Sequence, residues 1–392
     1  MKNTRREFIK RTGLAGLVLG TPGIRNTMDG MNTGNSLQKF SFLNPVDGDM
    51  LCSYDGLVTK SGLKTKVTIL APEGLDLSVN GTKADFQAGQ YYAEVLLREY
   101  RNTIEMMDVS SGEKQSIVVF WLKNFMDKYR LSLDDNIWFL KDISNNAGVY
   151  RSIFENPYLG FLKQVHETYG TKIHLNIYYQ TEGFNLSQLT DKYKGEWKDN
   201  AGWLRMSFHA LQNDPDKPYI QAGYDVVKKD CELVTEQIRR FAGEQLMGPV
   251  TTLHWGEATV EGCRALRDSG YTALAGYFNV DHPEPVSYYL DDVQRRRVNS
   301  RFIWRDNREG IIFARMAIII NTLPLDQIVP YLDNLGVNSH KPAYADLMIH
   351  EQYFYPFYSA YQPDYREKVL TSVRWAVEKG YKPAFLSECI FS

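Results

Sequence analysis

Four apolar segments of this sequence end on side chains that can bind a metal ion or carry a proton. The first runs into the acid pair Asp134-Asp135, and three later segments end on a histidine, namely His209, His254 and His350. Apolar runs of this length are typical of buried strands, and the carboxyl ends of parallel strands meet at one face of an α/β fold. Two adjacent carboxylates are costly unless a cation or proton lies between them. The pattern therefore predicts one metal-dependent hydrolytic site built from all four segments.

Between residue 125 and the end of the chain, strand patterns alternate with helical patterns. Strands are expected at 129–135, 173–179, 203–209, 250–254, 272–278, 302–304, 310–320, 345–350 and 384–386. Helices are expected at about 155–169, 224–241, 257–268, 324–335 and 364–379, and residues 279–300 are expected to be an insertion. This alternation predicts an α/β domain, residues 125–392, with a parallel sheet that forms a closed or nearly closed barrel.

Residues 40–122 have a different pattern, in which short β-rich runs such as 66–70 and 91–97 are separated by turn signals. Asn80-Gly81 is the strongest hairpin candidate. Strands at this spacing predict a small all-β sandwich domain. It resembles the immunoglobulin-like modules attached to many bacterial carbohydrate-active enzymes. The segment has no acid–histidine cluster, so we expect it to pack against the second domain or to bind glycan.

The amino-terminal residues 1–38 are expected to be an export signal and a linker. Arg5-Arg6 with Phe8 resembles a twin-arginine signal, and the apolar stretch 13–20 that follows is too short to span a bilayer. A basic amphipathic helix is the alternative. The signal predicts a periplasmic or extracellular protein with no stable membrane span after signal removal, and the formal charge of −2 gives no indication of nucleic-acid binding.

The order of the motifs in residues 125–388 resembles that of the NodB-type polysaccharide deacetylases, whose fold is a distorted (β/α)7 barrel. In that family an Asp-Asp pair ends strand one, which implies that Asp134 is the general base and Asp135 a metal ligand. The second family motif is His-x-x-x-His, with both histidines on the metal; His209 matches the first, and Asn213 stands in place of the second. The last motif is Leu-x-His, whose histidine is the general acid. It corresponds to His350, with Met in place of Leu.

The replaced histidine leaves the third metal ligand open. His254 could supply it from the neighbouring strand, or Asn213 or Asp214 could supply an oxygen atom. One carboxylate and two imidazoles form a three-ligand site with an open position for water. Imidazole ligands favour a divalent ion such as Zn, with Co, Ni or Mn as alternatives.

Aromatic and acidic side chains near the same strand ends are candidates for substrate binding. They are Trp255, Glu257, Glu351, Tyr353 and Tyr355. The expected function is an exported, metal-dependent hydrolase that removes acyl groups from a glycan. Two alternatives stay open: a metal-independent glycoside hydrolase that uses two carboxylates, for instance Asp135 with Glu257, and a barrel that binds glycan without catalysis.

Overall fold

The computed structural model describes residues 39–278, 286–336 and 341–391. These residues form two compact units that divide between Lys123 and Asn124. No helix in the described ranges is long and apolar enough to cross a membrane. The export signal and linker predicted at 1–38 lie outside the described residues, as does part of the predicted insertion.

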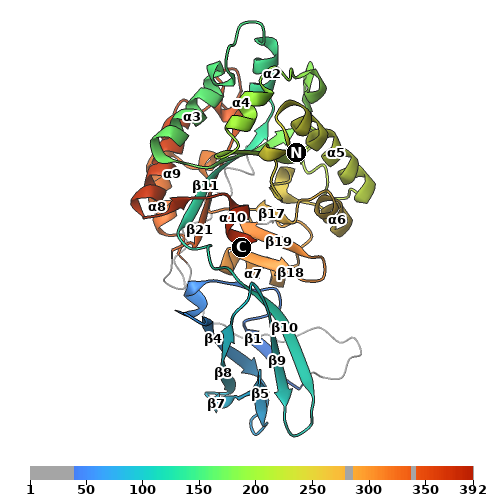
Figure 1. The fold of residues 1–392 in the computed structure, drawn as a ribbon, viewed down its shortest axis with the longest axis vertical. Coiled ribbons are helices and arrows are strands. Elements are labelled where there is room, and N and C mark those ends of the chain that lie inside the picture. The colour runs from blue at the N-terminus through green and yellow to red at the C-terminus, as the bar shows by residue number, and fades with distance from the viewer. Residues whose placement is uncertain (1–38, 279–285, 337–340, 392) are drawn as a thin grey trace. The chain divides into compact units, whose positions relative to one another are not determined.

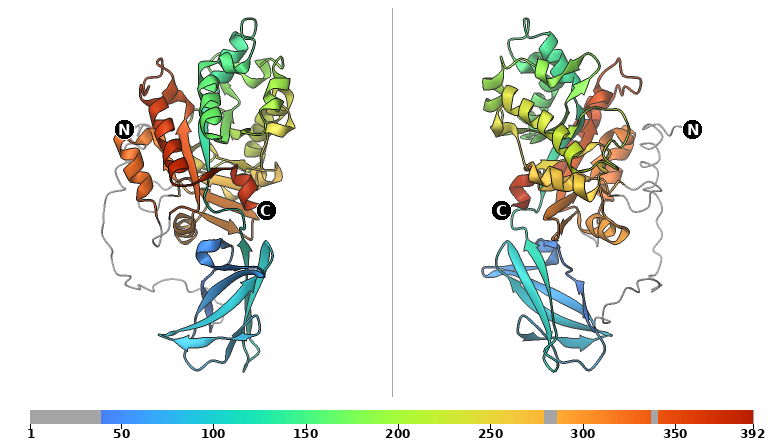
Figure 2. Two further views of the ribbon diagram at one scale, coloured as in Figure 1. Left: turned by 60° about the vertical axis from the view of Figure 1, so that its left-hand side comes forward. Right: turned by 90° about the vertical axis from the view of Figure 1, so that its right-hand side faces the viewer.

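The amino-terminal unit consists of two five-stranded sheets that share one apolar core, and Figure 2 shows them face to face. The first sheet has the order β1 (Ser41–Asn44), β4 (Gly62–Leu70), β8 (Gln90–Leu97) and β7 (Asp85–Gln87), with β3 (Gly56–Thr59) paired to β4. The second has the order β2 (Met50–Leu51), β10 (Lys114–Trp121), β9 (Arg101–Asp108), β5 (Leu77–Val79) and β6 (Thr82–Lys83).

Alternation of buried and exposed residues explains why these segments form strands. In β4, Leu63, Val67 and Ile69 face the core while the lysines between them face water. The hairpin predicted at Asn80-Gly81 is confirmed, because both residues have positive φ and connect the antiparallel strands β5 and β6. The unit is therefore an all-β sandwich, and its immunoglobulin-like character stays a prediction.

The carboxy-terminal unit is built around β11 (Lys128–Asn136), the central strand of a six-stranded parallel sheet. The order is β15 (Leu204–Ala210), β12 (Ile173–Tyr178), β11, β21 (Tyr344–His350) and β20 (Ile318–Ile319), with β22 (Lys382–Pro383) paired to the start of β11. A second sheet has the order β16 (Val250–Thr251), β17 (Ala273–Gly276), β19 (Ile311–Arg315) and β18 (Ile303–Asp306), of which β18 is antiparallel.

The closed barrel expected from the sequence is not observed, because the strands divide into two open sheets. The strand predicted at 250–254 ends at Thr251, so it is too short to continue the ladder of β15. An isolated bridge, Met206 to Met247, pairs β15 with the segment just before β16. On the other side the chain passes directly from β19 to β20. Between these strands the backbone N–H of Met316 donates a hydrogen bond to the carbonyl oxygen of Gly276 in β17, and the N–H of Ala317 donates one to that of Asp346 in β21.

Helices lie around the outside of these sheets (Figure 1). They are α2 (Trp138–Asn145), α3 (Pro157–Tyr169), α4 (Lys194–Asp199), α5 (Tyr224–Phe241), α6 (Val260–Asp268), α7 (Asp292–Arg301), α8 (Ile328–Asp333), α9 (Tyr365–Glu378) and α10 (Leu386–Ile390). The boundaries of α3 follow from its sequence, since Asn156 caps the first turn, Pro157 is the first helical residue and Gly170 ends the helix in the left-handed conformation.

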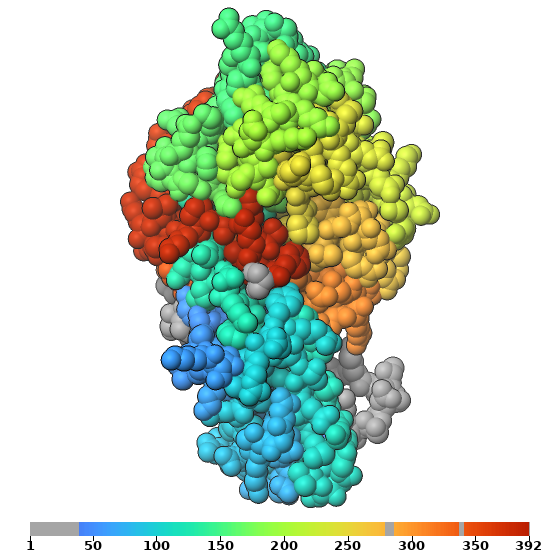
Figure 3. All heavy atoms as spheres, in the orientation of Figure 1, coloured from blue at the N-terminus to red at the C-terminus, as the bar shows by residue number. Residues whose placement is uncertain are grey.

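The last helix, α10, covers the amino-terminal ends of the central strands. Glu388 pairs with Lys172 beside the start of β12, at 2.8 Å, and the guanidinium of Arg205 in β15 stacks on Phe385. Figure 3 shows this surface, with the carboxy-terminal segment in red next to the green and orange segments. The short strand predicted at 384–386 is therefore wrong: the two-residue strand β22 ends before it and α10 begins at Leu386. Because α10 covers the amino-terminal ends of these strands, a site is expected at their carboxyl ends.

A buried ion pair connects the two central strands of the larger sheet. Arg130 of β11 and Asp346 of β21 are paired in register. They form two hydrogen bonds of 3.0 and 2.7 Å, and Ser132 donates a third, of 2.7 Å, to Asp346. Both charged side chains are almost completely buried, so the pairing removes the cost of leaving either charge alone in the interior.

Removing one partner of this pair should be strongly destabilising. Asp346→Ala leaves the Arg130 guanidinium buried without its carboxylate, and we expect a loss of about 3–5 kcal/mol in the free energy of unfolding, measured by urea denaturation. As a control, Glu167→Ala removes the exposed helical pair with Lys163 and should cost about 0.3–0.5 kcal/mol. Equal effects of the two substitutions would contradict this account.

Candidate metal centre

A β-bulge sets the directions of the two adjacent acids. In the ladder between β11 and β12, Leu133 pairs with Leu175, but the next pair is Asn136 with Ile177, so β11 has one extra residue. Asp135 lies in this bulge and has a left-handed φ of 65°. A bulge bends the strand and re-aims its side chains, and here both carboxyl groups are buried with different partners.

His209 lies at the end of β15 and is held in one tautomer. Its Nδ1 lies 2.5 Å from the carbonyl oxygen of Thr252. A carbonyl only accepts, so Nδ1 carries the proton and the lone pair of neutral Nε2 faces Asp135 Oδ1, 3.0 Å away. Burial opposes protonation of His209, but the charges of Asp134 and Asp135 outweigh it and raise the pKa of this imidazole. The site thus attracts positive charge.

His254 lies in the 3-10 turn His254–Gly256 that follows β16 and is oriented in the same way. Its Nε2 lies 3.0 Å from the backbone carbonyl oxygen of Asn213, so this nitrogen donates. The lone pair of Nδ1 therefore faces the cluster, 3.3 Å from Asp135 Oδ1 and 3.3 Å from His209 Nε2. Asn213, four residues after His209, thus orients the imidazole of His254 through its backbone.

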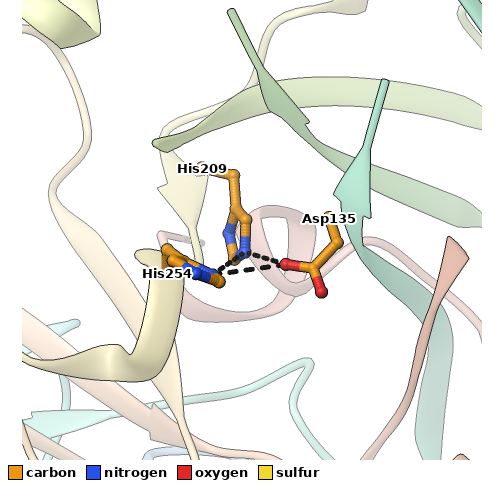
Figure 4. Close-up of side chains that lie close together, drawn as sticks. All are labelled: Asp135, His209 and His254. Carbon is orange, nitrogen blue, oxygen red and sulfur yellow. Dashed lines mark hydrogen bonds and ion pairs between the residues drawn. The ribbon is translucent and has the colours of Figure 1, made fainter. Parts of the chain in front are cut away.

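The three side chains have the geometry of a metal centre (Figure 4). The donor atoms of Asp135, His209 and His254 are 3.0–3.3 Å apart, and a tetrahedral zinc ion with bonds of ~2.0–2.1 Å places its ligand atoms about 3.3 Å apart. Three lone pairs that face one another repel unless a cation or an added proton lies between them. Backbone carbonyls that fix both imidazoles are typical of the outer partners of a metal site.

Tyr178, at the end of β12, was not predicted as a site residue. Its hydroxyl group contacts Asp135 Oδ1 and lies 2.8 Å from His254 Nδ1. Its ring packs against both imidazoles, with centroid distances of 5.1 Å to His209 and 5.2 Å to His254. A signal for Tyr178 was present in the sequence, since it is the penultimate residue of the strand predicted at 173–179, close to the strand end as Asp135 and His209 are.

Asp134 and His350 lie opposite each other in the ladder of β11 and β21. Asp134 accepts a hydrogen bond of 2.6 Å from the side-chain amide of Asn176, and burial raises its pKa to about 6. Asn321 Oδ1 accepts from the backbone N–H of His350 at 3.2 Å and lies 2.8 Å from its Nδ1. This Nδ1 therefore carries a proton, and Nε2 is the nitrogen that can exchange one.

Two cavities border these residues. A small one of about 60 Å³ is lined by Asp134, His209, His350 and Trp255, with apolar walls that include Met316 and Met348. A large one of about 790 Å³ is lined by Asp135 and Tyr178, the rings of Trp138 and Tyr358, and the amides of Gln180, Asn185, Gln188, Gln212, Asn213 and Gln352. The hairpin of β13 (Gln180–Thr181) and β14 (Phe184–Asn185) forms one side of the large cavity.

Of the five residues proposed for substrate binding, Trp255 lines the small cavity, whereas Glu257, Glu351, Tyr353 and Tyr355 line neither cavity. The contacts of Glu351 indicate a structural role. Its carboxylate accepts from the backbone N–H groups of residues 137, 138 and 139 at 2.6–3.0 Å, and from the hydroxyl of Tyr355 at 2.8 Å. These residues begin α2, and a carboxylate at a helix N-terminus stabilises the helix.

No protein-family model and no curated protein matches this sequence. Among solved structures, a 4-alpha-glucanotransferase from Thermococcus litoralis is 13% identical with a TM-score of 0.44, over 68% of this chain and 40% of that one. A putative polysaccharide deacetylase from Mycobacterium smegmatis is 11% identical with a TM-score of 0.34, and the match covers 66% of this chain and 93% of that one. Agd3, a novel carbohydrate deacetylase, is 9% identical with a TM-score of 0.35, and the match covers 87% of this chain and 68% of that one. The chain thus spans less than half of the glucanotransferase, and likeness at this level identifies no family.

Glu351 should make stability depend on pH. Burial raises its pKa to about 7, above the value of about 4.3 in an unfolded chain, so the folded state binds this proton more tightly. The stabilisation is fully present below about pH 4.3 and is lost as the pH rises through about 7. In metal-free protein, Glu351→Gln should therefore reduce the stability difference between pH 5 and pH 8 by on the order of 2 kcal/mol.

The control for this measurement concerns Asp134, whose raised pKa of about 6 acts in the same direction. The comparison is therefore made with Asp134→Asn present in both chains. Urea denaturation at the two pH values gives the stabilities. An unchanged pH dependence after Glu351→Gln would show that this carboxyl group titrates normally.

Proposed function

We propose that this protein is a metal-dependent hydrolase that removes small acyl groups from a glycan. The observation that carries the proposal is the convergence of the lone pairs of Asp135, His209 and His254, with both imidazoles fixed by backbone carbonyls. A divalent ion bound by these residues would polarise the acyl carbonyl and lower the pKa of water. Zinc fits the two imidazoles and the donor spacing, and Co, Ni or Mn could replace it.

Asp134 is the proposed general base. At a pKa of about 6 its carboxyl group is ionised at neutral pH and still basic enough to take a proton from water. The Asn176 amide donates to Oδ1, which fixes the orientation of the carboxylate. Asp134 also lines the small cavity next to His209, so it faces the space in which an acyl carbon would be attacked.

His350 is the proposed general acid. It lines the same cavity, and because its Nδ1–H is held by Asn321, its Nε2 is the nitrogen that would deliver a proton to the leaving group. The small size of this cavity and its apolar walls at Met316 and Met348 suit a short acyl group such as acetyl.

The large cavity supports a glycan as the substrate. Its volume of about 790 Å³ is in the range of ligand pockets. Carboxamides can donate to and accept from sugar hydroxyl groups, and the rings of Trp138 and Tyr358 offer apolar faces. The periplasm or the extracellular space, proposed from residues 1–38, is where such a substrate would be met.

The two alternative functions have less support in the site. A glycoside hydrolase that uses Asp135 and Glu257 needs both carboxyl groups beside the substrate, but Glu257 lines neither cavity and Asp135 contacts the two histidines. A protein that only binds glycan would not need two imidazoles in fixed tautomers beside a carboxylate.

Metal analysis combined with activity tests the proposal. Purified protein should contain one divalent ion per chain and release acetate from N-acetylated or O-acetylated sugar oligomers. Asp135→Ala and His209→Ala should each lose the ion and the activity together. Asp134→Asn should keep the ion and lower kcat by about 10²–10⁴-fold, the usual contribution of a general base.

The contrast between these variants makes the result specific. A chain with full activity after chelation and dialysis would exclude a metal-dependent reaction. Full metal content in the Asp135→Ala, His209→Ala double variant would place the ion elsewhere. An Asp134→Asn chain with unchanged kcat would remove Asp134 from the role of base while leaving the metal centre intact.

Trp138 should contribute to glycan affinity rather than to chemistry. Its ring lines the large cavity and packs at 5.0–5.6 Å against Phe357, Tyr355 and Tyr358. Trp138→Ala should raise KM for a sugar oligomer about 3–10-fold, from a loss of about 0.5–1.5 kcal/mol of aromatic contact, with little change in kcat. Trp138→Phe, which keeps a ring, should recover part of the loss. An unchanged KM in both variants would mean that the glycan does not contact this wall.

A further inference from the structure

One buried face of the larger sheet carries polar side chains that form a continuous row of hydrogen bonds. Arg130 and Asp134 lie four residues apart in β11, and His174 and Asn176 lie two apart in β12, so each pair points to the same face of its strand. The row runs from Arg130 through His174, Ser207 and Asn176 to Asp134, and all five side chains are at most 3% exposed. It therefore leads from the buried ion pair to the proposed general base.

The first two hydrogen bonds fix the tautomer of His174. Arg130 Nη1 lies 2.9 Å from His174 Nδ1, and a guanidinium group only donates, so Nδ1 is the nitrogen without a proton. Nε2 then carries the proton and donates it to Ser207 Oγ, 2.8 Å away. Burial and the charge of Arg130 lower the pKa of this imidazole well below its usual value, which agrees with a neutral ring.

The next two hydrogen bonds fix the side-chain amide of Asn176. Ser207 Oγ accepts from His174 and donates its own proton to Asn176 Oδ1 at 2.6 Å. The backbone N–H of Thr252 donates to the same oxygen at 3.4 Å. The NH₂ group of Asn176 therefore faces Asp134 and donates to its Oδ1 at 2.6 Å. The flipped amide would place two acceptor oxygens against each other, so every bond of the row has one direction.

We propose that His174 and Ser207 are positioning residues for the reaction, an inference that rests on the proposed function. They hold the amide of Asn176 in one orientation, so that Asp134 Oδ1 always meets an N–H donor and Oδ2 is the oxygen that takes the proton of water. No proton moves along the row, because each hydrogen stays on its donor. Arg130 sets the direction, since its guanidinium group can only donate.

Two buried serines provide a matched pair of variants. Ser207→Ala breaks the row, whereas Ser132→Ala removes a hydroxyl that donates to Asp346 of the same ion pair, at 2.7 Å, and lies outside the row. Both serines are fully buried, so the two variants should lower the midpoint of urea denaturation by similar amounts. Ser207→Ala should also lower kcat for acetate release by about 3–10-fold, the rate equivalent of one net hydrogen bond. Its KM and its content of bound ion should stay unchanged, and Ser132→Ala should keep the wild-type kcat.

Nitrogen NMR of protein with labelled histidines tests the direction of the row without any substrate. The imidazole whose signals disappear in His174→Phe should have a proton on Nε2 and none on Nδ1 in the wild type. His174→Gln serves for the same assignment if His174→Phe does not fold. A proton on Nδ1 of this ring would overturn the inference, because Arg130 could then not donate to it.

The outcomes separate the row from the proposed function. Equal kcat values in Ser207→Ala and Ser132→Ala would overturn the positioning role and leave the proposed function standing. Loss of the bound ion from Ser207→Ala would also overturn it, because the effect would then lie in the metal centre. A wild type that releases no acetate would reject the proposed function and the role of the row together, whereas the NMR result decides the direction of the hydrogen bonds in either case.

Discussion

The single extra residue in β11 is the constraint on which the candidate site depends. Without the bulge, Asp134 and Asp135 would simply alternate across the sheet. With it, Asp135 adopts a left-handed φ and meets His209 and His254, while Asp134 is bonded to Asn176 beside His350. The carboxylate of Glu351 fixes the backbone that follows the bulge, because it accepts hydrogen bonds from three backbone N–H groups. This conformation is costly for a non-glycine residue and is held by its surroundings.

Much of the site could be predicted because strand periodicity and strand ends are local signals. The strands predicted at 129–135, 203–209 and 345–350 lie within one residue of the bounds of β11, β15 and β21, and the long helix at 224–241 has the predicted boundaries. Parallel strands bring such ends to one face regardless of their separation in sequence. The grouping of Asp135, His209 and His254 followed from this rule together with the resemblance to the deacetylase motifs.

The remaining features depend on contacts between distant residues, which a single sequence does not encode locally. Glu351 and Tyr355 have the composition of a sugar-binding rim, yet the carboxylate of Glu351 accepts hydrogen bonds from the start of α2, more than 200 residues earlier, and the hydroxyl of Tyr355 donates to that carboxylate. Tyr178 was overlooked because tyrosine ends many strands for packing reasons. The open sheet depends on β16 stopping at Thr251, three residues before the predicted end, and the ends of an element are its least predictable part.

Crystals grown with Zn²⁺ and measured on both sides of the zinc absorption edge give the most direct test of the central claim. The account predicts one anomalous difference peak bounded by the side chains of Asp135, His209 and His254 in the wild type, and its loss in Asp135→Ala. A wild-type crystal with no peak at this place, or with zinc bound only by other residues, would contradict it.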